Sequence, residues 1–220
     1  MLAYNHGPFI RAAVESVLRQ QTNFPYEIIV GEDSSTDDTC AVLGELARAH
    51  PGRLHLHLHK RNIGANANFA ETLAACRGKF VALLEGDDQW LGTEKLQRQV
   101  DYLQTHPACA MCFHDVLVVN EGAPDQTPAR YCQPKPPASP TLEDLLARNI
   151  VPTCSVVFRR ELLPPLSPAL QQLPMQDWPS WVLLAKRGGI AYLDEVWGCY
   201  RVHSGGSWSS QINERQLRNV

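Results

Sequence analysis

The sequence predicts an α/β domain in which a mainly parallel sheet is flanked by helices. Two observations support this prediction. Short apolar runs typical of buried strands alternate along the chain with segments whose apolar residues recur at helical spacing. Polar clusters directly follow several of the apolar runs, at the place where a parallel sheet exposes the carboxyl ends of its strands. With 220 residues, of which 44% are hydrophobic, the chain is expected to form one domain with its own core.

The expected strands and helices follow from these two patterns. Strands are predicted at 26–30, 54–59, 80–84, 108–119, 153–158, 190–193 and 196–200. Helices are predicted at about 8–19, around 42–46, from 65 to 78, around 96–103, from 141, and at 177–187. The opening strand is expected to be truncated, because only three residues precede Tyr4. Either translation begins upstream of Met1, or the first central strand is a stub that weakens the middle of the sheet.

Composition and charge exclude several classes of protein. Lys and Arg number 20 and Asp and Glu number 23, so the net charge of −3 favours no nucleic-acid partner. The sequence has neither a transmembrane stretch nor a signal peptide, so a cytoplasmic location is expected. The seven cysteines are then expected to be reduced thiols. Cys109 and Cys112 have the spacing of half a zinc site, but no second half follows. Six prolines between 122 and 140 predict a mobile loop at 121–140 and no domain boundary.

Three polar clusters are expected at the carboxyl edge of the sheet: Tyr4-Asn5, Glu32-Asp33 and Asp87-Asp88. Residues 85–88 place three carboxylates within four positions, where unpaired charges repel one another. A divalent cation such as Mg²⁺ or Mn²⁺ would remove that repulsion. The alternative is a solvated acidic turn that caps the next helix. Glu32-Asp33 would accept hydrogen bonds from a base or ribose, or only cap a helix, and Tyr4 would stack on a base or pack on the sheet.

Three further features allow both a functional and a structural interpretation. His55, His57 and His59 share one strand face and could bind zinc, but no carboxylate or cysteine neighbour completes a site, so a partly wet strand face is favoured. Asp177 opens a helix, where capping is favoured over action as a general base. Arg201 and His203, in a glycine-containing tail, would meet a diphosphate or belong to an ordinary polar loop.

Taken together and in this order, these segments resemble inverting glycosyltransferases of family 2, which have the GT-A fold. Tyr4-Asn5 resembles the end of the family's opening Pro-x-Tyr-Asn strand. Residues 26–39 and 78–91 resemble its two acidic stretches, with Glu32 and Glu85 in place of the first Asp of each. Similar segments also occur at Asn62-Ile-Gly64 with Asn68, at 177–188 and at 200–203.

The resemblance implies transfer of a sugar from a nucleoside diphosphate to an acceptor hydroxyl, with inversion at the anomeric carbon. Residues 1–105 would form the nucleotide-sugar-binding half of a single domain spanning 1–220, and 106–220 the acceptor-side half. The residues implied to bind the nucleotide sugar are Tyr4, Glu32, Asp33, Asn62, Asn68 and Asp87. A Mn²⁺ or Mg²⁺ ion on the diphosphate would be held by Asp88, with help from Asp87 and His203. Asp177 would deprotonate the acceptor.

The acceptor, by the same resemblance, is a glycan, a lipid-linked sugar or another hydroxyl compound, as in polysaccharide biosynthesis. Peripheral association with the inner membrane surface would suit such an acceptor. The alternative is an inactive sugar-nucleotide or glycan-binding module with the same fold. A nucleotidyltransferase is disfavoured because no glycine-rich, basic triphosphate loop is present. A dinucleotide oxidoreductase is disfavoured because no Gly-x-Gly-x-x-Gly follows a strand.

Overall fold

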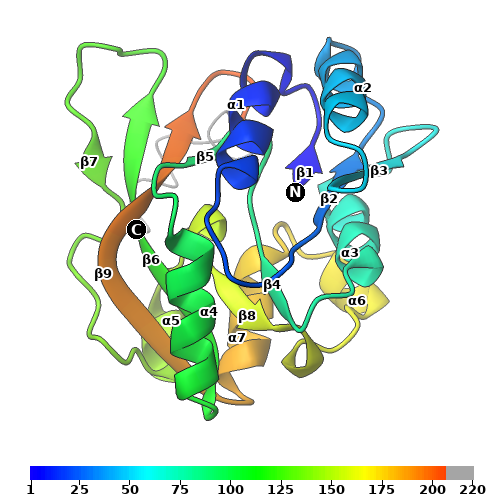
Figure 1. The fold of residues 1–220 in the computed structure, drawn as a ribbon. Coiled ribbons are helices and arrows are strands. Elements are labelled where there is room, and N and C mark those ends of the chain that lie inside the picture. The colour runs from blue at the N-terminus through cyan, green and yellow to red at the C-terminus, as the bar shows by residue number, and fades with distance from the viewer. Residues whose placement is uncertain (207–220) are drawn as a thin grey trace.

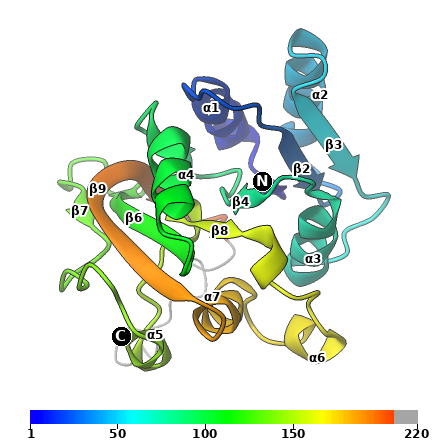
Figure 2. The same cartoon turned by 60° about the horizontal axis from the view of Figure 1, so that its bottom comes forward.

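The computed structural model describes residues 1–206, without the side chains of residues 168 and 171. A three-stranded parallel sheet forms the first half, in the spatial order β1-β2-β3. Its strands are β1 (Leu2–Ala3), β2 (Ile28–Glu32) and β3 (Leu54–Leu58). The helices that connect and follow them are α1 (Gly7–Leu18), α2 (Thr39–Ala49) and α3 (Ala65–Ala75). Helices α1 and α2 pack together on one face of this sheet, and α3 covers the other face (Figure 1, Figure 2).

A second sheet has the order β4-β8-β6-β9-β5, with β7 paired to β6. Its strands are β4 (Phe80–Ala82), β5 (Gln89–Trp90), β6 (Cys109–Asn120), β7 (Ala129–Arg130), β8 (Val157–Arg159) and β9 (Gly189–Val202). Only β6 and β9 run parallel, and the other neighbouring strands are antiparallel. The helices of this half are α4 (Lys95–Thr105), α5 (Leu142–Ala147), α6 (Pro168–Gln171) and α7 (Asp177–Ala185). Helix α4 covers one face of this sheet and α7 the other (Figure 2).

Strand β1 joins the two sheets. The amide of Leu2 donates to the carbonyl of Leu84 at 3.3 Å, and the carbonyl of Leu2 accepts from the amide of Gly86 at 2.8 Å. These contacts make a parallel bridge between Leu2 and Glu85. The spatial order is therefore β3-β2-β1-β4-β8-β6-β9-β5. The residues that follow β1, β2 and β4 all emerge at the same edge, as expected for parallel strands.

The predicted architecture is confirmed, and β1 has only two residues, as the short opening run predicts. The structure adds the short elements β5, β7 and α6, which the sequence patterns did not predict, and it differs clearly from the expectation at the predicted strand 153–158 and at the pair now joined in β9. The predicted strands at 190–193 and 196–200 form one strand, β9, because a bulge accommodates the polar residues between Leu193 and Val196. The predicted strand at 153–158 begins as a 3₁₀ turn, Thr153–Ser155, and only 157–159 pair in the sheet.

The segment 121–140 contains ordered structure. Its strand β7 pairs with β6, and Arg130 Nε lies 2.9 Å from Oδ2 of the buried Asp115. The Cys132 amide donates to Oδ1 of the same carboxylate at 3.0 Å. These contacts hold the middle of the segment, while the mobility of the rest stays a prediction. No helix within residues 1–206 combines the length and the apolar character needed to cross a membrane.

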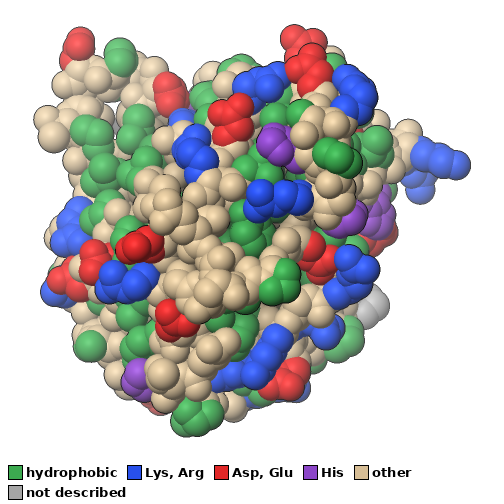
Figure 3. Space-filling model, in the orientation of Figure 1, with side chains coloured by type: hydrophobic (Ala, Val, Ile, Leu, Met, Phe, Trp, Pro, Cys, Tyr) green, Lys and Arg blue, Asp and Glu red, His purple; other side chains and the backbone are tan. Residues whose placement is uncertain are grey.

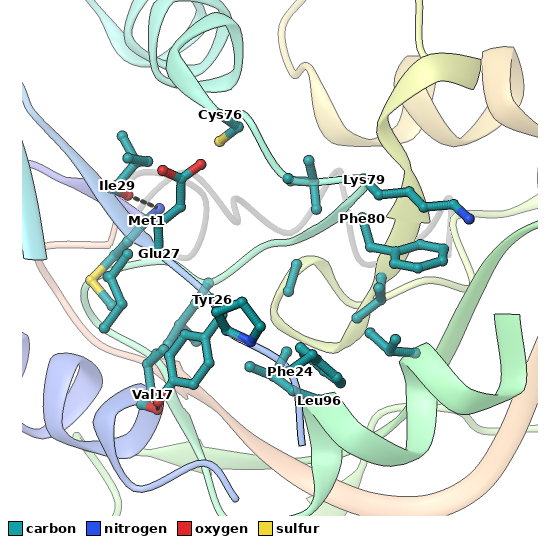
Figure 4. Close-up of a pocket in the computed structure, with 18 of the residues that line it drawn as sticks. Met1, Val17, Phe24, Tyr26, Glu27, Ile29, Cys76, Lys79, Phe80 and Leu96 are labelled. Carbon is teal, nitrogen blue, oxygen red and sulfur yellow. Dashed lines mark hydrogen bonds between the residues drawn. The ribbon is translucent and has the colours of Figure 1, made fainter. Parts of the chain in front are cut away.

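An apolar pocket of about 320 Å³ lies between the beginning of β2 and β4, next to Met1 (Figure 4). The Met1 ammonium donates to the carbonyl of Ile29 at 2.7 Å, and burial lowers the pKa of this amine. Tyr26 and Phe80 contribute aromatic walls. The pocket lies at the amino ends of the strands, opposite the edge where open α/β sheets bind their ligands. It is therefore distinct from the polar site described next.

Candidate active site

Polar residues from both sheets meet at the carboxyl edge, around the acidic turn formed by residues 85–88. Asp87 Oδ2 lies 3.1 Å from Nε2 of His203, which follows β9, and 3.5 Å from Nε2 of His6, which follows β1. We call Asp87, His6 and His203 the central cluster. Their side chains are 15%, 10% and 9% exposed, so the cluster is enclosed but reachable.

Gly86 allows the acidic turn to approach β1 this closely. A Cβ atom at position 86 would lie 2.7 Å from Nδ1 of His6 and 3.1 Å from the carbonyl oxygen of Leu2. Both distances are too short for an unstrained contact. A side chain here would therefore displace the hydrogen bond to β1 or move His6 away from Asp87.

Asp88 points away from the central cluster. Its side chain is buried, and its Oδ1 accepts a hydrogen bond from the Arg201 amide at 2.8 Å. Its Oδ2 lies near the Cys154 thiol and accepts no hydrogen bond from any other described residue. The Arg201 guanidinium donates to the carbonyl of Asp87 at 2.7 Å and to Oε1 of Gln89 at 2.8 Å. Asp88 and Arg201 thus fasten the acidic turn to β9. That Asp88 is the main metal ligand stays a prediction, and Asp87 is the carboxylate that faces the two histidines.

The acidic turn gathers three carboxyl groups, two of them buried in surroundings that disfavour their charged forms. Burial, with the Asp87 charge in second place, raises the pKa of Asp88 to about 8. Burial also raises the pKa of Glu85, helped by the charges of Asp88, Asp87 and Asp177. The Oε2 atom of Glu85 is buried and accepts no hydrogen bond within residues 1–206. A divalent cation beside Asp87 would favour the charged forms of all three carboxylates. Among the two expected ions, a donor set of one carboxylate and two imidazoles suits Mn²⁺ better than Mg²⁺, which prefers oxygen ligands.

Glu32 and Asp33 follow β2 and organise the neighbouring loops. The Glu32 carboxylate accepts from the amides of Ser35 at 2.7 Å and Ser34 at 3.2 Å. The Asp33 carboxylate accepts from the amide of Ile63 at 2.7 Å and from that of Gly64 at 2.9 Å. Neither carboxylate is an N-cap, because the cap of α2 is Asp38. Each carboxylate oxygen keeps lone pairs that can accept further hydrogen bonds.

The three remaining residues predicted to bind a nucleotide lie in different surroundings. Tyr4 is 40% exposed after β1, where its ring is open to a planar ligand. Asn62 lies in the β3–α3 loop, with its Oδ1 accepting from the Gly64 amide at 3.0 Å. Asn68 is buried, and its amide donates to the carbonyl of Gly31 at 3.0 Å. The structure therefore brings Tyr4 and Asn62 to the surface near Asp33, while Asn68 has an interior position that suits support of the site.

Asp177 is the first residue of α7 and does not cap it. The N-cap is Gln176, whose side chain makes no capping hydrogen bond. Asp177 Oδ2 accepts instead from Thr153 Oγ1 at 3.0 Å and from Asn149 Nδ2 at 3.3 Å. No described residue donates to its Oδ1. The charge of Asp177 contributes to the raised pKa of Glu85, after burial and the charges of Asp88 and Asp87. Asp177 therefore does not cap α7, and its role as general base stays a prediction.

Sequence reasoning missed His6 as a site residue, and it missed Thr153 and Asn149 as residues that position Asp177. His6 had one available signal, since it directly follows Tyr4-Asn5 at the end of the first strand. Thr153 and Asn149 had none, because the turn that brings them to α7 has no distinct sequence pattern.

Comparison with known proteins decides the family. The model of glycosyl transferase family 2 matches residues 1–163. The chain belongs to this family. It is 39% identical to an uncharacterised protein of Mycobacterium tuberculosis, over 98% of this chain and 61% of that protein. It is 30% identical to the putative teichuronic acid biosynthesis glycosyltransferase TuaG of Bacillus subtilis, over 91% of this chain and 76% of TuaG.

A solved structure confirms the GT-A fold. The mannosyltransferase PcManGT from Pyrobaculum calidifontis, in complex with GDP-Man and Mn²⁺, matches with a TM-score of 0.72. The match covers 98% of this family 2 chain and 59% of the mannosyltransferase, at 20% identity. The chain thus spans about three-fifths of the length of this structure and of the mycobacterial relative.

Proposed function

We propose that this chain catalyses metal-dependent transfer of a sugar from a nucleoside diphosphate donor to an acceptor hydroxyl, with inversion. The observation that carries the proposal is the meeting of Asp87 with His203 and His6 beside two buried carboxylates of raised pKa. Family membership and the complex of PcManGT with GDP-Man and Mn²⁺ support it.

The nucleotide would bind along the carboxyl edge of the first sheet. Asp33 would accept hydrogen bonds from the base, since each of its oxygens has lone pairs beyond those used by the Ile63 and Gly64 amides. The exposed ring of Tyr4 would stack on the base. Asn62 and Glu32 would complete this side, and Asn68 would support it from the interior.

Asp87 and His203 would hold the divalent ion, with His6 as a further nitrogen ligand or a donor to the diphosphate. When bound, the ion supplies Lewis-acid neutralisation of the leaving diphosphate. Asp88 and Arg201 fix the direction of the Asp87 side chain by fastening the turn to β9. They act as positioning residues in this proposal.

Asp177 would take the proton from the acceptor hydroxyl. Thr153 and Asn149 hold Oδ2, which leaves Oδ1 for the acceptor. The oxygen of the acceptor then attacks the anomeric carbon from the face opposite the diphosphate, the bond to the diphosphate breaks, and one displacement inverts the configuration.

We propose a glycan or a lipid-linked sugar as the acceptor, by analogy with TuaG and its assignment to teichuronic acid biosynthesis. Action at the cytoplasmic surface of the inner membrane is part of the same proposal.

Calorimetric titration with UDP, GDP, dTDP and CDP tests the donor site. We expect one nucleotide to bind in Mn²⁺ and to lose most of its affinity in EDTA. Asp87→Asn should weaken the Mn²⁺-dependent binding about 100-fold or more, because it removes the carboxylate that faces both histidines. Asp101→Asn, on the exposed surface of α4, is the matched control. A folded wild-type protein that binds none of the four nucleotides would contradict the proposal. Tight binding with no turnover on any acceptor would instead favour a binding module.

A further inference from the structure

A second group of metal-ligating side chains lies on the open edge of the first sheet, away from the central cluster. His57 in β3, His59 directly after β3, and Glu71 in α3 form this edge cluster. Glu71 Oε2 lies 3.6 Å from Nε2 of His57 and 3.8 Å from Nδ1 of His59. One ligand atom from each residue fits within 4.8 Å of the others. Histidine side chains reach the surface beside β3 and α3, as the purple atoms at the right of Figure 3 show.

The hydrogen bonds of Asn68 determine which nitrogen of His59 carries the proton. Asn68 Nδ2 donates to the carbonyl of Gly31 at 3.0 Å, so Oδ1 points the other way. Oδ1 accepts from Thr72 Oγ1 at 3.1 Å and lies 3.1 Å from Nε2 of His59. Nε2 must therefore donate, because Oδ1 has no proton to give. In the neutral ring, Nδ1 then carries a lone pair that faces the Glu71 carboxylate.

The position of Asn68 is built into β2. A Cβ atom at Gly31 would lie 2.2 Å from Asn68 Oδ1 and 1.9 Å from Thr72 Oγ1. Only glycine leaves room for this pair of side chains. A histidine whose second nitrogen donates to a fixed carbonyl oxygen is the usual arrangement around a protein-bound metal, because it fixes the ring and its tautomer.

We propose that the edge cluster binds a Zn²⁺ ion through His57 Nε2, His59 Nδ1 and the Glu71 carboxylate, with water in the fourth position. Two imidazoles and one carboxylate are common zinc ligands. Without a cation, the lone pair of His59 Nδ1 faces the Glu71 carboxylate, and two hydrogen-bond acceptors oppose each other. A cation between them would form a coordinate bond to each. The sequence of β3 offers histidines but no carboxylate, and in the structure Glu71 of α3 supplies it. His55 is not one of the proposed ligands.

The bound ion would clamp β3 to α3 at the base of the loop 60–64. This loop supplies the Ile63 and Gly64 amides that bind Asp33. The zinc site is therefore a structural clamp under the loop that borders the candidate nucleotide site. It does not depend on the glycosyltransferase proposal, because none of its ligands belongs to the central cluster.

Zinc titration of EDTA-treated, tag-free protein against a chromophoric chelator tests the proposal. Glu71→Gln is the first variant, since this side chain is 54% exposed and glutamine has nearly the same size. His57→Ala is the second, and His55→Ala, on the same strand face but outside the cluster, is the matched control. We expect wild type and the control to bind one equivalent of zinc, and each cluster variant to bind it at least about 10-fold more weakly.

Thermal unfolding and cobalt substitution give independent readouts. Zinc should raise the Tm of wild type and of His55→Ala but not that of Glu71→Gln. Co²⁺ in the site should show ligand-field absorption without the sulfur charge-transfer bands of a thiolate ligand. Three results would each overturn the proposal: equal zinc affinity in wild type and Glu71→Gln, loss of the zinc equivalent only in His203→Ala, or strong sulfur bands with Co²⁺. The proposal would also be wrong if Glu71→Gln had a lower Tm than wild type while zinc left the Tm of wild type unchanged. Glu71 would then form an ordinary ion pair with the histidines and no zinc site.

Discussion

The central cluster and the edge cluster contain the same groups, two imidazoles and one carboxylate, in different surroundings. The central cluster joins residues from three distant segments, with 116 positions between Asp87 and His203. Its side chains are at most 15% exposed. The edge cluster is local, and its His57 and Glu71 side chains are 40% and 54% exposed.

The difference shows that the surroundings, more than the ligand set, decide what a bound ion does. Beside the central cluster lie Glu85 and Asp88, two buried carboxyl groups with raised pKa values, so a cation there would favour charged forms that the fold alone disfavours. Beside the edge cluster lies Asn68, which only orients His59. The first arrangement suits binding of an anionic ligand through the ion, and the second suits a structural ion.

The largest expected effect is on the transfer rate of an Asp177 variant, with little change in its nucleotide affinity. Asp177→Asn should lower the transfer rate by roughly 10²–10⁴-fold, because it removes the proposed general base. The nucleotide affinity should change little, because Asp177 contacts only Thr153 and Asn149 by hydrogen bonds. Radiolabelled transfer and calorimetry measure the two quantities. Glu71→Gln is the control and should leave the transfer rate within about twofold; transfer by Asp177→Asn at the wild-type rate would remove this residue from the mechanism.

The next effect concerns stability and pH. The pKa of Asp88 is about 8 in the folded protein, against an ordinary value of 3.8. At a pH between these two values, the Asp88 carboxyl group is protonated in the folded protein and ionised in the unfolded chain. The contribution of Asp88 to stability is therefore fully present below pH 4 and is lost as the pH rises towards 8. The Asp88→Asn variant has no charge to bury. At pH 8 its free energy of unfolding should be higher than that of the metal-free wild type by roughly 1–4 kcal/mol, and at pH 5 the difference should be much smaller.

Urea unfolding in EDTA at the two pH values gives this comparison. Glu71→Gln should differ from wild type by no more than about 0.5 kcal/mol at either pH, because its side chain is half-exposed. A gain for Asp88→Asn that is equal at pH 5 and pH 8 would mean that Asp88 is not a buried anion.

A smaller effect tests the division between the clusters directly. His203→Ala should weaken Mn²⁺-dependent nucleotide binding about 10-fold or more and leave zinc affinity unchanged. His57→Ala should do the reverse. Calorimetry with each ion on both variants measures all four affinities. If either variant lowered both affinities equally, the two clusters would not be separate sites.

The smallest expected effect comes from the support of Asp177. Thr153→Ala removes the donor at 3.0 Å from Oδ2 and leaves Asn149 in place. We expect a loss of about threefold to tenfold in the transfer rate at unchanged nucleotide affinity, corresponding to one hydrogen bond of about 1 kcal/mol. Thr153→Ser should restore most of the rate, which a purely structural role of the methyl group would not allow.

The sequence predicted the fold better than it predicted the direction of individual side chains. Strand and helix patterns, and the polar residues after the strands, are sufficient to place Asp33 and Asp87 at one edge of the sheet. Asp87 and Asp88 are adjacent, however, and point to different sides because the backbone of the turn and the Arg201 amide orient them. A motif of consecutive acidic residues does not contain that information.

The edge cluster shows a second limit. The histidine strand looked incomplete because no carboxylate lies next to it in the sequence. Glu71 reaches it because α3 packs against β2 and β1, with its face set by Asn68 and Thr72 against Gly31. Contacts between a strand and the following helix depend on the length and course of the loop between them, here residues 59–64, and local periodicity does not fix either.

The two-residue strand β1 joins the two sheets through very few hydrogen bonds. The Leu2 amide and carbonyl bind the loop after β4, and this loop continues directly into the acidic turn. An apolar core common to both halves, in which Val14 of α1 packs in one cluster with Trp90 of β5, holds the halves together beside these bonds. The hydrogen bonds that join the sheets are therefore the same ones that place Asp87 beside His6.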